Sequence, residues 1–361
     1  MRMAAFTRYG ARAASTRQRL LQYLPHLRAA GIDIEWHALL DDAYVRGLET
    51  GEQYPKLRVA KAYLKRMGQL RANEGSDLLW VYADLFPYLP AAFEQWLLGR
   101  HRAIVYDFDD AFFHHYDGRS NPLARWALGG KFAELLKRAA VCFCGNAYVR
   151  DYAAQYCANS IVLPTVVDTS IYQPMVRVPA SGPLVIGWIG SPTTWPNVRP
   201  LLPLLKQLCA ERSVRVRVVG AGSAAEQDRF PGLELVEWSE ATEIAEVQAM
   251  AVGIMPLLDR PFERGKSGYK LIQYMACGLP VVASPVGVNC EIVDQDENGL
   301  LATSESEWRD ALLRLISDEP LRARLGSNGR LRTEANYSLA SQAPRLVEAL
   351  RAAAQLDRRG I

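Results

Sequence analysis

The chain has 361 residues, with 49% hydrophobic and 22% charged side chains and a formal net charge of +3. These values are close to the averages of globular proteins and exclude disordered, collagen-like and coiled-coil chains. The length predicts two domains, because a single core rarely grows to this size. The charge is too small for a general nucleic-acid binder, and neither a spanning helix nor the apolar run of a signal peptide stands out. We therefore expect a folded cytoplasmic protein that binds no nucleic acid.

Short apolar runs alternate with helical patterns along the first half of the chain. The runs predict strands at 4–7, 33–37, 77–82, 103–107, 140–144 and 160–163. Amphipathic segments at 15–30 and 56–72 predict helices between them. This half, residues 1–168, is also the basic one, with 21 basic and 17 acidic side chains. The alternation is typical of βα units around a parallel sheet.

The stretch 164–183 follows, with four prolines and no periodicity, and it predicts a linker at 169–183. The alternation then resumes, with strands predicted at 184–190, 215–220, 233–238, 252–257, 280–284 and 299–302. We therefore predict an α/β protein of two doubly wound, Rossmann-like domains, 1–168 and 184–336, which face each other across a cleft. A helical tail at 337–361 is expected to pack back on the first domain. Ligands of such sheets bind at the carboxyl ends of the strands.

The segment 261–287 carries a Gly-flanked, Lys-bearing loop that runs into a predicted helix at about 267–276. Backbone N–H groups at a helix N-terminus attract anions, and Lys266 and Lys270 lie one turn apart at that end. Two solvated lysines on an ordinary amphipathic helix would give the same pattern. Charge alone therefore leaves both interpretations open.

The sequence MACGLPVVAS at 275–284 resembles the donor-binding region of family 4 glycosyltransferases, which are group 1 glycosyl transferases with the GT-B fold. The runs at 184–202 and 216–223 resemble the first two strands and turns of their C-terminal domain. The resemblance implies transfer of a sugar from a UDP- or GDP-sugar, held by the C-terminal domain. The acceptor would be a glycan or lipid-linked glycan of cell-surface polysaccharide or glycolipid assembly. It further implies retention of configuration and a reaction without metal or other cofactor.

The resemblance also implies which residues hold the donor. They are Gly190, Ser191, Gly220, Glu263, Lys266, Ser267, Gly268, Tyr269, Lys270 and Gln273, together with Gly10 and Arg17 in the loop after the first strand. The chain departs from the family pattern in two respects. Gly265 and Gln273 stand where the family has the glutamates of its E-x7-E motif, and Ser191 stands where it has an arginine. We expect the 264–270 loop to supply the cations and Gln273 to hydrogen-bond in place of a glutamate.

Three aspartates and two histidines follow the predicted strand at 103–107. Like charges so close together repel and shift each other's pKa, so packing alone does not readily explain them. We predict that Asp107, Asp109, Asp110 and His114 bind the acceptor or the reacting sugar. A helix cap and a solvated turn are the alternative. A metal site is not expected, because the surroundings resemble the GT-B enzymes; if the reaction inverts configuration, Asp109 or Asp110 is the natural general base.

The segment 54–73 contains six basic residues and no acidic one, with apolar residues at helical spacing. A basic amphipathic helix of this kind can rest on anionic lipid, which would place the protein peripherally on the inner membrane face. The alternative is an outer helix whose apolar stripe, including Leu57 and Leu64, packs on the core. Both remain open from the sequence.

Three other functions compete with the transferase. The run VVGAGSAAEQ at 218–227 has the G-x-G-x-x-A spacing of a dinucleotide site, but Pro231 is too close for the long helix that should follow. A nucleotide-sugar epimerase of the same fold would bind the same donor. A non-catalytic binding protein is suggested by the missing glutamates.

Overall fold

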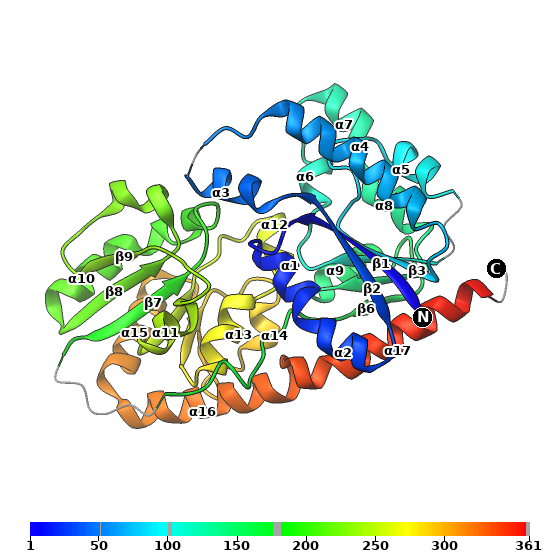
Figure 1. Ribbon diagram of the computed structural model, residues 1–361. Coiled ribbons are helices and arrows are strands. Elements are labelled where there is room, and N and C mark those ends of the chain that lie inside the picture. The colour runs from blue at the N-terminus through cyan, green and yellow to red at the C-terminus, as the bar shows by residue number, and fades with distance from the viewer. Residues whose placement is uncertain (51, 100–102, 176–181, 359–361) are drawn as a thin grey trace. The chain divides into compact units, whose positions relative to one another are not determined.

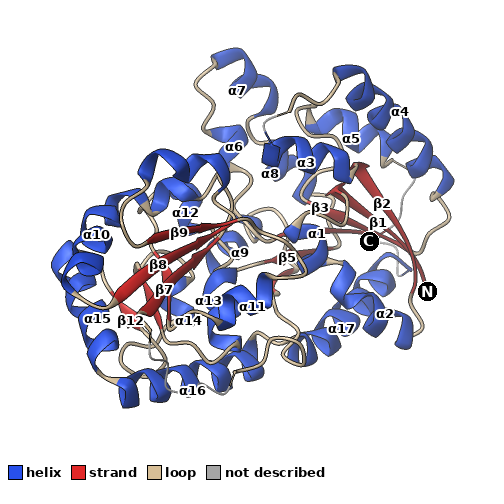
Figure 2. Ribbon diagram, turned by 60° about the vertical axis from the view of Figure 1, so that its left-hand side comes forward, coloured by secondary structure: helices blue, strands red, loops and turns tan. Residues whose placement is uncertain are grey.

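The computed structural model describes residues 1–50, 52–99, 103–175 and 182–358 (Figure 1). The chain divides into two compact units. Unit 1 comprises Met1–Thr165, Arg264–Ser267 and Gln342–Ile361, and unit 2 comprises Val166–Glu263 and Gly268–Ser341. In its described residues, each unit contains a six-stranded parallel sheet with helices packed against it (Figure 2).

The sheet of unit 1 has the strand order β2-β1-β3-β4-β5-β6. Its strands are β1 (Arg2–Tyr9), β2 (Asp33–Leu40), β3 (Leu78–Tyr82), β4 (Ala103–Phe108), β5 (Val141–Cys144) and β6 (Ser160–Val162). The central strands β3, β4 and β5 are buried along their whole length. This explains their continuous apolar sequence, since helices cover both faces of a central parallel strand. The order reverses between β1 and β3, where the crevice of a doubly wound sheet opens at the carboxyl ends.

The helices of unit 1 include the two predicted segments, the first of them with a break. They are α1 (Ala14–Arg19), α2 (Leu24–Ala29), α3 (Asp42–Thr50), α4 (Lys56–Ala72), α5 (Ala91–Leu97), α6 (His114–Asp117), α7 (Pro122–Leu128), α8 (Lys131–Leu136), α9 (Ala147–Ala153) and most of α17 (Leu339–Arg358). The predicted helix at 15–30 is interrupted by a 3-10 turn at Leu21–Tyr23, just before Pro25. Proline lacks the N–H that a continuous helix would need there. In α17, Arg351 donates to the carbonyl of Ala30 at 2.6 Å.

The sheet of unit 2 has the order β12-β11-β10-β7-β8-β9. Its strands are β7 (Leu184–Ile189), β8 (Val214–Val219), β9 (Leu233–Val236), β10 (Val252–Met255), β11 (Val281–Ala283) and β12 (Leu300–Leu301). Its helices are α10 (Leu202–Glu211), α11 (Glu243–Gln248), α12 (Pro261–Arg264, whose last residue belongs to unit 1), α13 (Tyr269–Ala276), α14 (Asn289–Ile292), α15 (Glu305–Ser317) and α16 (Glu319–Asn336). The order reverses between β7 and β10, as in a dinucleotide-binding fold. The prediction of two doubly wound α/β sheets is confirmed.

Candidate functional site

The aspartate run after β4 is divided among three different environments. Asp107 is completely buried, and both of its carboxylate oxygens accept from Arg19, the shorter contact being 2.6 Å. The indole N–H of Trp80 donates to it at 3.2 Å. Burial raises the pKa of Asp107, although the Arg19 charge acts in the opposite direction. A cavity of about 10 Å³ beside this pair has room for about one water. The geometry supports a role in positioning the end of β4 rather than contact with a substrate.

Asp109 is slightly exposed to solvent and has a strongly shifted pKa. It is 8% exposed, and its carboxylate accepts from the hydroxyl of Tyr82 at 2.7 Å. Burial and the neighbouring charge of Asp110 raise its pKa to about 7. A carboxyl group with such a pKa can hold or release a proton near neutral pH, as a general acid or base must.

Asp110 is paired with the predicted donor lysine. Its carboxylate contacts the ammonium of Lys266 at 2.8 Å and accepts from the backbone N–H of Ser267 at 3.1 Å. From the neighbouring strand end, the amide of Asn146 donates to the carbonyls of Gly265 and Lys266, both at 3.0 Å. We call Asp110, Asn146 and the segment 265–267 the clamp. It fixes the lysine in unit 1, although the lysine is only four residues before Lys270 of unit 2.

Close backbone packing explains the residue types around the clamp. A Cβ on Gly265 would lie 2.2 Å from that of Ala111, and one on Gly145 would lie 2.3 Å from the carbonyl oxygen of Asp109. Asn146 is buried and also caps α9 by accepting from the N–H of Val149 at 2.9 Å. One asparagine therefore begins a helix and holds the 265–267 segment at the same time. Lys266 keeps 18% of its side chain exposed.

The two histidines of the run separate. His114 lies 2.9 Å from the hydroxyl of Tyr148, and its ring packs against Phe113. His115 instead feels the charges of Lys266, Arg8 and Asp110, and burial together with the two cations lowers its pKa. His114 was the predicted site residue, whereas the charges of Lys266 and Asp110 act on His115, the second histidine of the run. Arg8 and Asn146 also lie beside the predicted segments and were not among the candidates from the sequence.

The loop after β1 is held in shape by its own side chains. A Cβ on Gly10 would lie 2.3 Å from an Asp42 carboxylate oxygen, which accepts from the N–H of Arg12 at 2.8 Å. Arg17 donates to the carbonyls of Ala11 and Arg12. These contacts order the loop at the carboxyl end of β1. They give Arg17 a role within the loop and do not themselves place it at a donor.

In unit 2 the predicted glycine loops pack directly on one another. A Cβ on Gly220, which has a φ of 82°, would lie 2.4 Å from the carbonyl oxygen of Gly190. One on Gly190 would lie 2.4 Å from the ring of Trp188 and 2.8 Å from Cε of Lys270. The ammonium of Lys270 lies 5.5 Å from the centre of that ring. Three predicted donor residues thus meet at the end of β7, where Ser191 is exposed.

Gln273 lies inside unit 2. Its amide nitrogen donates to Glu243 at 2.8 Å and to the hydroxyl of Tyr172 at 3.2 Å. A glutamate at this position would face the Glu243 carboxylate, which explains the departure from the E-x7-E pattern. Glu263 lies in the short helix α12, and Tyr269 opens α13. Gly268, with a φ of 69°, precedes α13, whose N-terminus no side chain caps.

Helix α4 turns only the C-terminal part of its apolar stripe to the core, where Leu70 is buried and Met67 packs against the core cluster. Leu57 and Leu64 are each 68% exposed, whereas Arg66 is completely buried and donates to the carbonyl of Thr7 at 2.9 Å. The interpretation that these two leucines pack on the core is therefore wrong. Burying the guanidinium against strand carbonyls turns the helix, and the leucines point outward among basic residues.

Among the described residues, no group of three or more His, Cys, Asp or Glu side chains is arranged to hold a metal ion. None of the helices in these residues has the length and hydropathy needed to span a bilayer.

Comparison with known proteins shows which family the second half of the chain resembles. Residues 183–318 match the sequence profile of the family described as Glycosyl transferases group 1. The resemblance to the group 1 glycosyl transferases is confirmed. The matched segment contains the glycine loops of unit 2 and the whole run from Lys266 to Gln273.

Two curated glycosyltransferases are similar over parts of their length. A D-inositol 3-phosphate glycosyltransferase of Stackebrandtia nassauensis is 29% identical over 194 residues, which are 46% of this chain and 43% of the relative. A glycosyltransferase of Methanocaldococcus jannaschii is 42% identical over 65 residues, 18% of each chain. The chain therefore spans less than half the length of either relative.

Solved structures match over almost the whole chain. Sucrose-phosphate synthase of Thermosynechococcus elongatus superposes with a TM-score of 0.75 at 17% identity, covering 100% of both chains. HepE of Anabaena, solved with UDP-glucose, gives 0.73 at 16% identity and covers 98% of this chain and 100% of its own. WaaG, described as a glycosyltransferase involved in lipopolysaccharide biosynthesis, gives 0.69 at 13%, covering 96% and 99%. The predicted GT-B fold is confirmed.

Proposed function

We propose that the protein is a glycosyltransferase that moves a sugar from a UDP- or GDP-sugar to a glycan or lipid-linked acceptor. The proposed setting is the assembly of cell-surface polysaccharide or glycolipid on the inner face of the membrane. The family match over 183–318 and the GT-B fold support the reaction class. The description of WaaG supports the setting by analogy of fold.

The observation that carries the proposal is the position of Lys266 in the clamp. A nucleoside diphosphate gains negative charge as it leaves its sugar, and prearranged positive groups lower that barrier. Asp110 contacts the Lys266 ammonium at 2.8 Å. We propose that this ammonium binds the diphosphate together with Ser267, Gly268, Tyr269 and Lys270, which follow in the chain.

Asp110 weakens the net charge of this group but fixes its geometry. A lysine side chain alone has many rotamers, and ordering it on binding costs free energy. The pair with Asp110 and the two bonds from Asn146 supply that order in advance. We propose that no metal ion or other cofactor is needed, because the lysines and backbone N–H groups meet the developing charge.

The acceptor side of the proposal rests on Asp109. In a reaction with retention, the bond from the acceptor oxygen to the sugar forms as the sugar–phosphate bond breaks, and the leaving phosphate takes the acceptor proton. Asp109 then orients the acceptor hydroxyl. In a reaction with inversion it takes the proton itself, for which a pKa of about 7 is suitable. Retention is our proposal, and the anomeric form of the product tests it.

Peripheral contact with the membrane is proposed through α4. Its exposed Leu57 and Leu64 stand among Lys56, Arg58, Lys61 and Lys65. Apolar side chains inserted between cations that meet anionic headgroups are the usual composition of an interfacial helix. Replacing both leucines by serine should reduce sedimentation with phosphatidylglycerol vesicles but not with phosphatidylcholine vesicles.

The experiment that tests the function measures binding and turnover separately. Melting temperature is recorded with a panel of nucleotides and nucleotide sugars, where a ligand at a hundredfold excess over its dissociation constant adds about 2.7 kcal/mol. Release of the nucleoside diphosphate is then measured with and without glycan acceptors. Release that requires an acceptor supports the transferase. Conversion of the donor without an acceptor would support the epimerase, and binding without any product would support the non-catalytic protein.

A further inference from the structure

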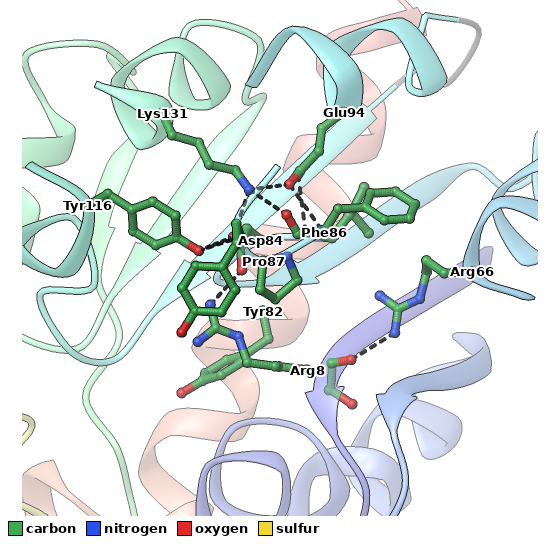
Figure 3. A network of polar contacts seen from close by, with 12 residues as sticks. Arg8, Arg66, Tyr82, Asp84, Phe86, Pro87, Glu94, Tyr116 and Lys131 are labelled. Carbon is green, nitrogen blue, oxygen red and sulfur yellow. Dashed lines mark hydrogen bonds and ion pairs between the residues drawn. The ribbon is translucent and has the colours of Figure 1, made fainter. Parts of the chain in front are cut away.

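A network of buried charges involves Arg8 at the carboxyl end of β1 and Asp84 just after β3 (Figure 3). The ammonium of Lys131 contacts Asp84 at 2.8 Å and Glu94 at 2.6 Å, and all three side chains are fully buried. Arg8, 16% exposed, contacts the other oxygen of Asp84 at 2.6 Å. The Tyr116 hydroxyl donates to Asp84 at 2.8 Å. Burial acts to raise the pKa of Asp84, but Arg8 and Lys131 hold it at about 2.

The network binds the backbone of the loop 83–90, which follows β3. Glu94 accepts from the N–H groups of Leu85 and Phe86 at 3.1 and 3.0 Å. Lys131 donates to the carbonyl of Phe86 at 2.7 Å. Further along, the hydroxyl of Tyr63 donates to the carbonyl of Pro87 at 2.6 Å. Buried ion pairs add little net stability. We therefore infer that the main effect of the network is to fix the backbone of this loop.

The loop needs such support because its backbone is strained at both ends. Ala83 has a φ of 59° and Tyr88 a φ of 66°. Residues with a Cβ rarely adopt this conformation, which costs on the order of 1 kcal/mol or more and persists only where the surroundings impose it. Such strain is concentrated at binding and catalytic sites. The N–H of Tyr88 is held by the hydroxyl of Tyr116 at 3.3 Å.

The result is an aromatic ring presented to solvent with a cation above it. Tyr88 is 63% exposed, and its ring lies 6.0 Å from that of Tyr116 at an angle of 28°. The guanidinium carbon of Arg119 lies 5.1 Å from the centre of the Tyr88 ring and 5.8 Å from that of Tyr116. Within the described residues, Nε of Arg119 is buried and has no hydrogen-bond partner. We call Tyr88 and Arg119 the platform.

Both the loop that carries Tyr88 and the aspartate run follow the carboxyl ends of strands in the same sheet. The Tyr88 loop starts at the end of β3, next to β1 and β4 in the strand order. Arg8 connects the two regions, because its guanidinium lies 5.8 Å from the centre of the Phe112 ring, and the N–H of Phe112 donates to the carbonyl of Asp110 at 2.8 Å. The crevice of this sheet type opens between β1 and β3.

We propose that the platform binds a sugar ring of the acceptor that carries a negative charge, either a phosphate or a carboxylate. The exposed face of the Tyr88 ring suits the apolar C–H face of a sugar, and the guanidinium of Arg119 pairs with the anion. The charges of Asp84 and Glu94 are compensated by Arg8 and Lys131, so the positive charge of Arg119 is left for a ligand. This inference rests on the proposed function and names the chemistry of its acceptor.

The test uses the full chain without donor and three probes. Saturation-transfer NMR compares glucuronic acid, glucose 1-phosphate and neutral glucose. The wild type should bind at least one anionic sugar more tightly than glucose. Arg119→Ala should weaken that binding roughly tenfold or more, as the loss of a charge-assisted hydrogen bond does. Tyr88→Phe keeps the ring and should bind normally, whereas Tyr88→Asn keeps the left-handed backbone without the ring and should bind weakly.

Arg125→Ala in α7 is the matched control, since Arg125 is an exposed arginine six residues away. Equal loss in this variant, equal binding of all three sugars or no binding of any of them would overturn the proposal. Unchanged melting temperatures ensure that the variants fold. A separate arm measures phosphatidylglycerol vesicles, and an effect of Arg119→Ala on vesicles alone would assign the platform to the membrane and also overturn it. Nucleotide-induced melting shifts test the proposed function independently, because they do not involve the platform.

Discussion

The carboxyl ends of the strands carry different kinds of residues in the two units. In unit 1 they carry charges in ion pairs, between Arg8 and Asp84, Arg19 and Asp107, and Lys266 and Asp110. In unit 2 the ends of β7 and β8 carry glycines packed on one another. Helices α11 and α13 are joined by an amide bonded to a carboxylate. Unit 1 therefore depends on particular charged side chains, in addition to close packing at Gly10, Gly145 and Gly265. Unit 2 depends on the absence of side chains where its loops approach each other.

This difference fits a division of labour between the units. A backbone without side chains lets a nucleotide approach closely and offers N–H donors that do not titrate. Fixed charges with shifted pKa values suit proton transfer and the recognition of charged groups. Charged side chains and packed glycines should also respond differently to substitution and to pH. Measurements of stability, turnover and ligand affinity therefore test the comparison.

The largest effect is expected for Lys131→Met. The substitution leaves Asp84 and Glu94 buried with one cation fewer, and breaking a buried pair in this way costs about 3 to 5 kcal/mol. In unit 2, Gln273→Met should cost only about 1 kcal/mol, because Glu243 keeps its bonds from Tyr172 and Trp238. Urea unfolding curves of both variants measure the difference. A greater loss of unfolding free energy in Gln273→Met than in Lys131→Met would contradict the proposed difference between the units.

Lys266→Ala should lower turnover by about 10² to 10³, or about 2 to 4 kcal/mol, through loss of a prearranged positive group. Kinetics with a donor found by the melting screen measure kcat and KM separately. Lys206→Ala, at an exposed position of α10, is the matched control and should have near-normal kinetics. Near-normal turnover of the Lys266 variant would remove this residue from the donor site.

Asn146→Ser sharpens that result. A serine can still cap α9, but its single O–H can replace at most one of the two bonds that Asn146 donates to the carbonyls of Gly265 and Lys266. The loss should raise the free-energy barrier that kcat/KM reports by about 1 to 2 kcal/mol, which is less than the effect of removing the lysine itself. An effect equal to that of Lys266→Ala would mean that the clamp, and not only the charge, is essential.

Asp109→Asn should make stability less dependent on pH. The folded-state pKa of Asp109 is about 7, well above that of an unfolded aspartate. The stability that the protonated group contributes is complete below the unfolded pKa and is lost as pH rises through about 7. The variant should therefore gain about 1 to 3 kcal/mol relative to the wild type between about pH 5 and about pH 8. Melting temperatures across this range measure the gain, and a constant difference would show that the carboxyl group does not titrate there.

The sequence predicted the sheets well because their signal is local. Apolar runs bounded by turns identify buried parallel strands without knowledge of their partners. The predicted helix at 56–72 also coincides with α4. Its orientation was not predictable, because the outward position of Leu64 depends on Arg66 reaching carbonyls on β1 and β2.

The site was predicted by segment more than by residue. Lys266 and Asp110 were both candidates, but their pairing joins residues 156 positions apart, and no local pattern reveals it. Asn146 gave only the signal of a helix cap. Arg8 and Lys131 gave none, because a single basic residue in an amphipathic segment is usually solvated. The tertiary structure decides which charges are buried together.

The smallest effect is expected where unit 2 requires an empty position. In Gly190→Ala the new Cβ would meet the Trp188 ring at 2.4 Å and Cε of Lys270 at 2.8 Å. The lysine end can move aside, whereas the buried ring resists. The loop should therefore shift, and nucleotide affinity should fall by about 1 kcal/mol, or roughly fivefold. Calorimetric titration measures this, with Gly182→Ala as control because nothing lies within 4 Å of its Cβ position. Unchanged affinity would mean that Gly190 is needed only for packing within unit 2. The difference between the strand ends of the two units would then affect folding and not ligand binding.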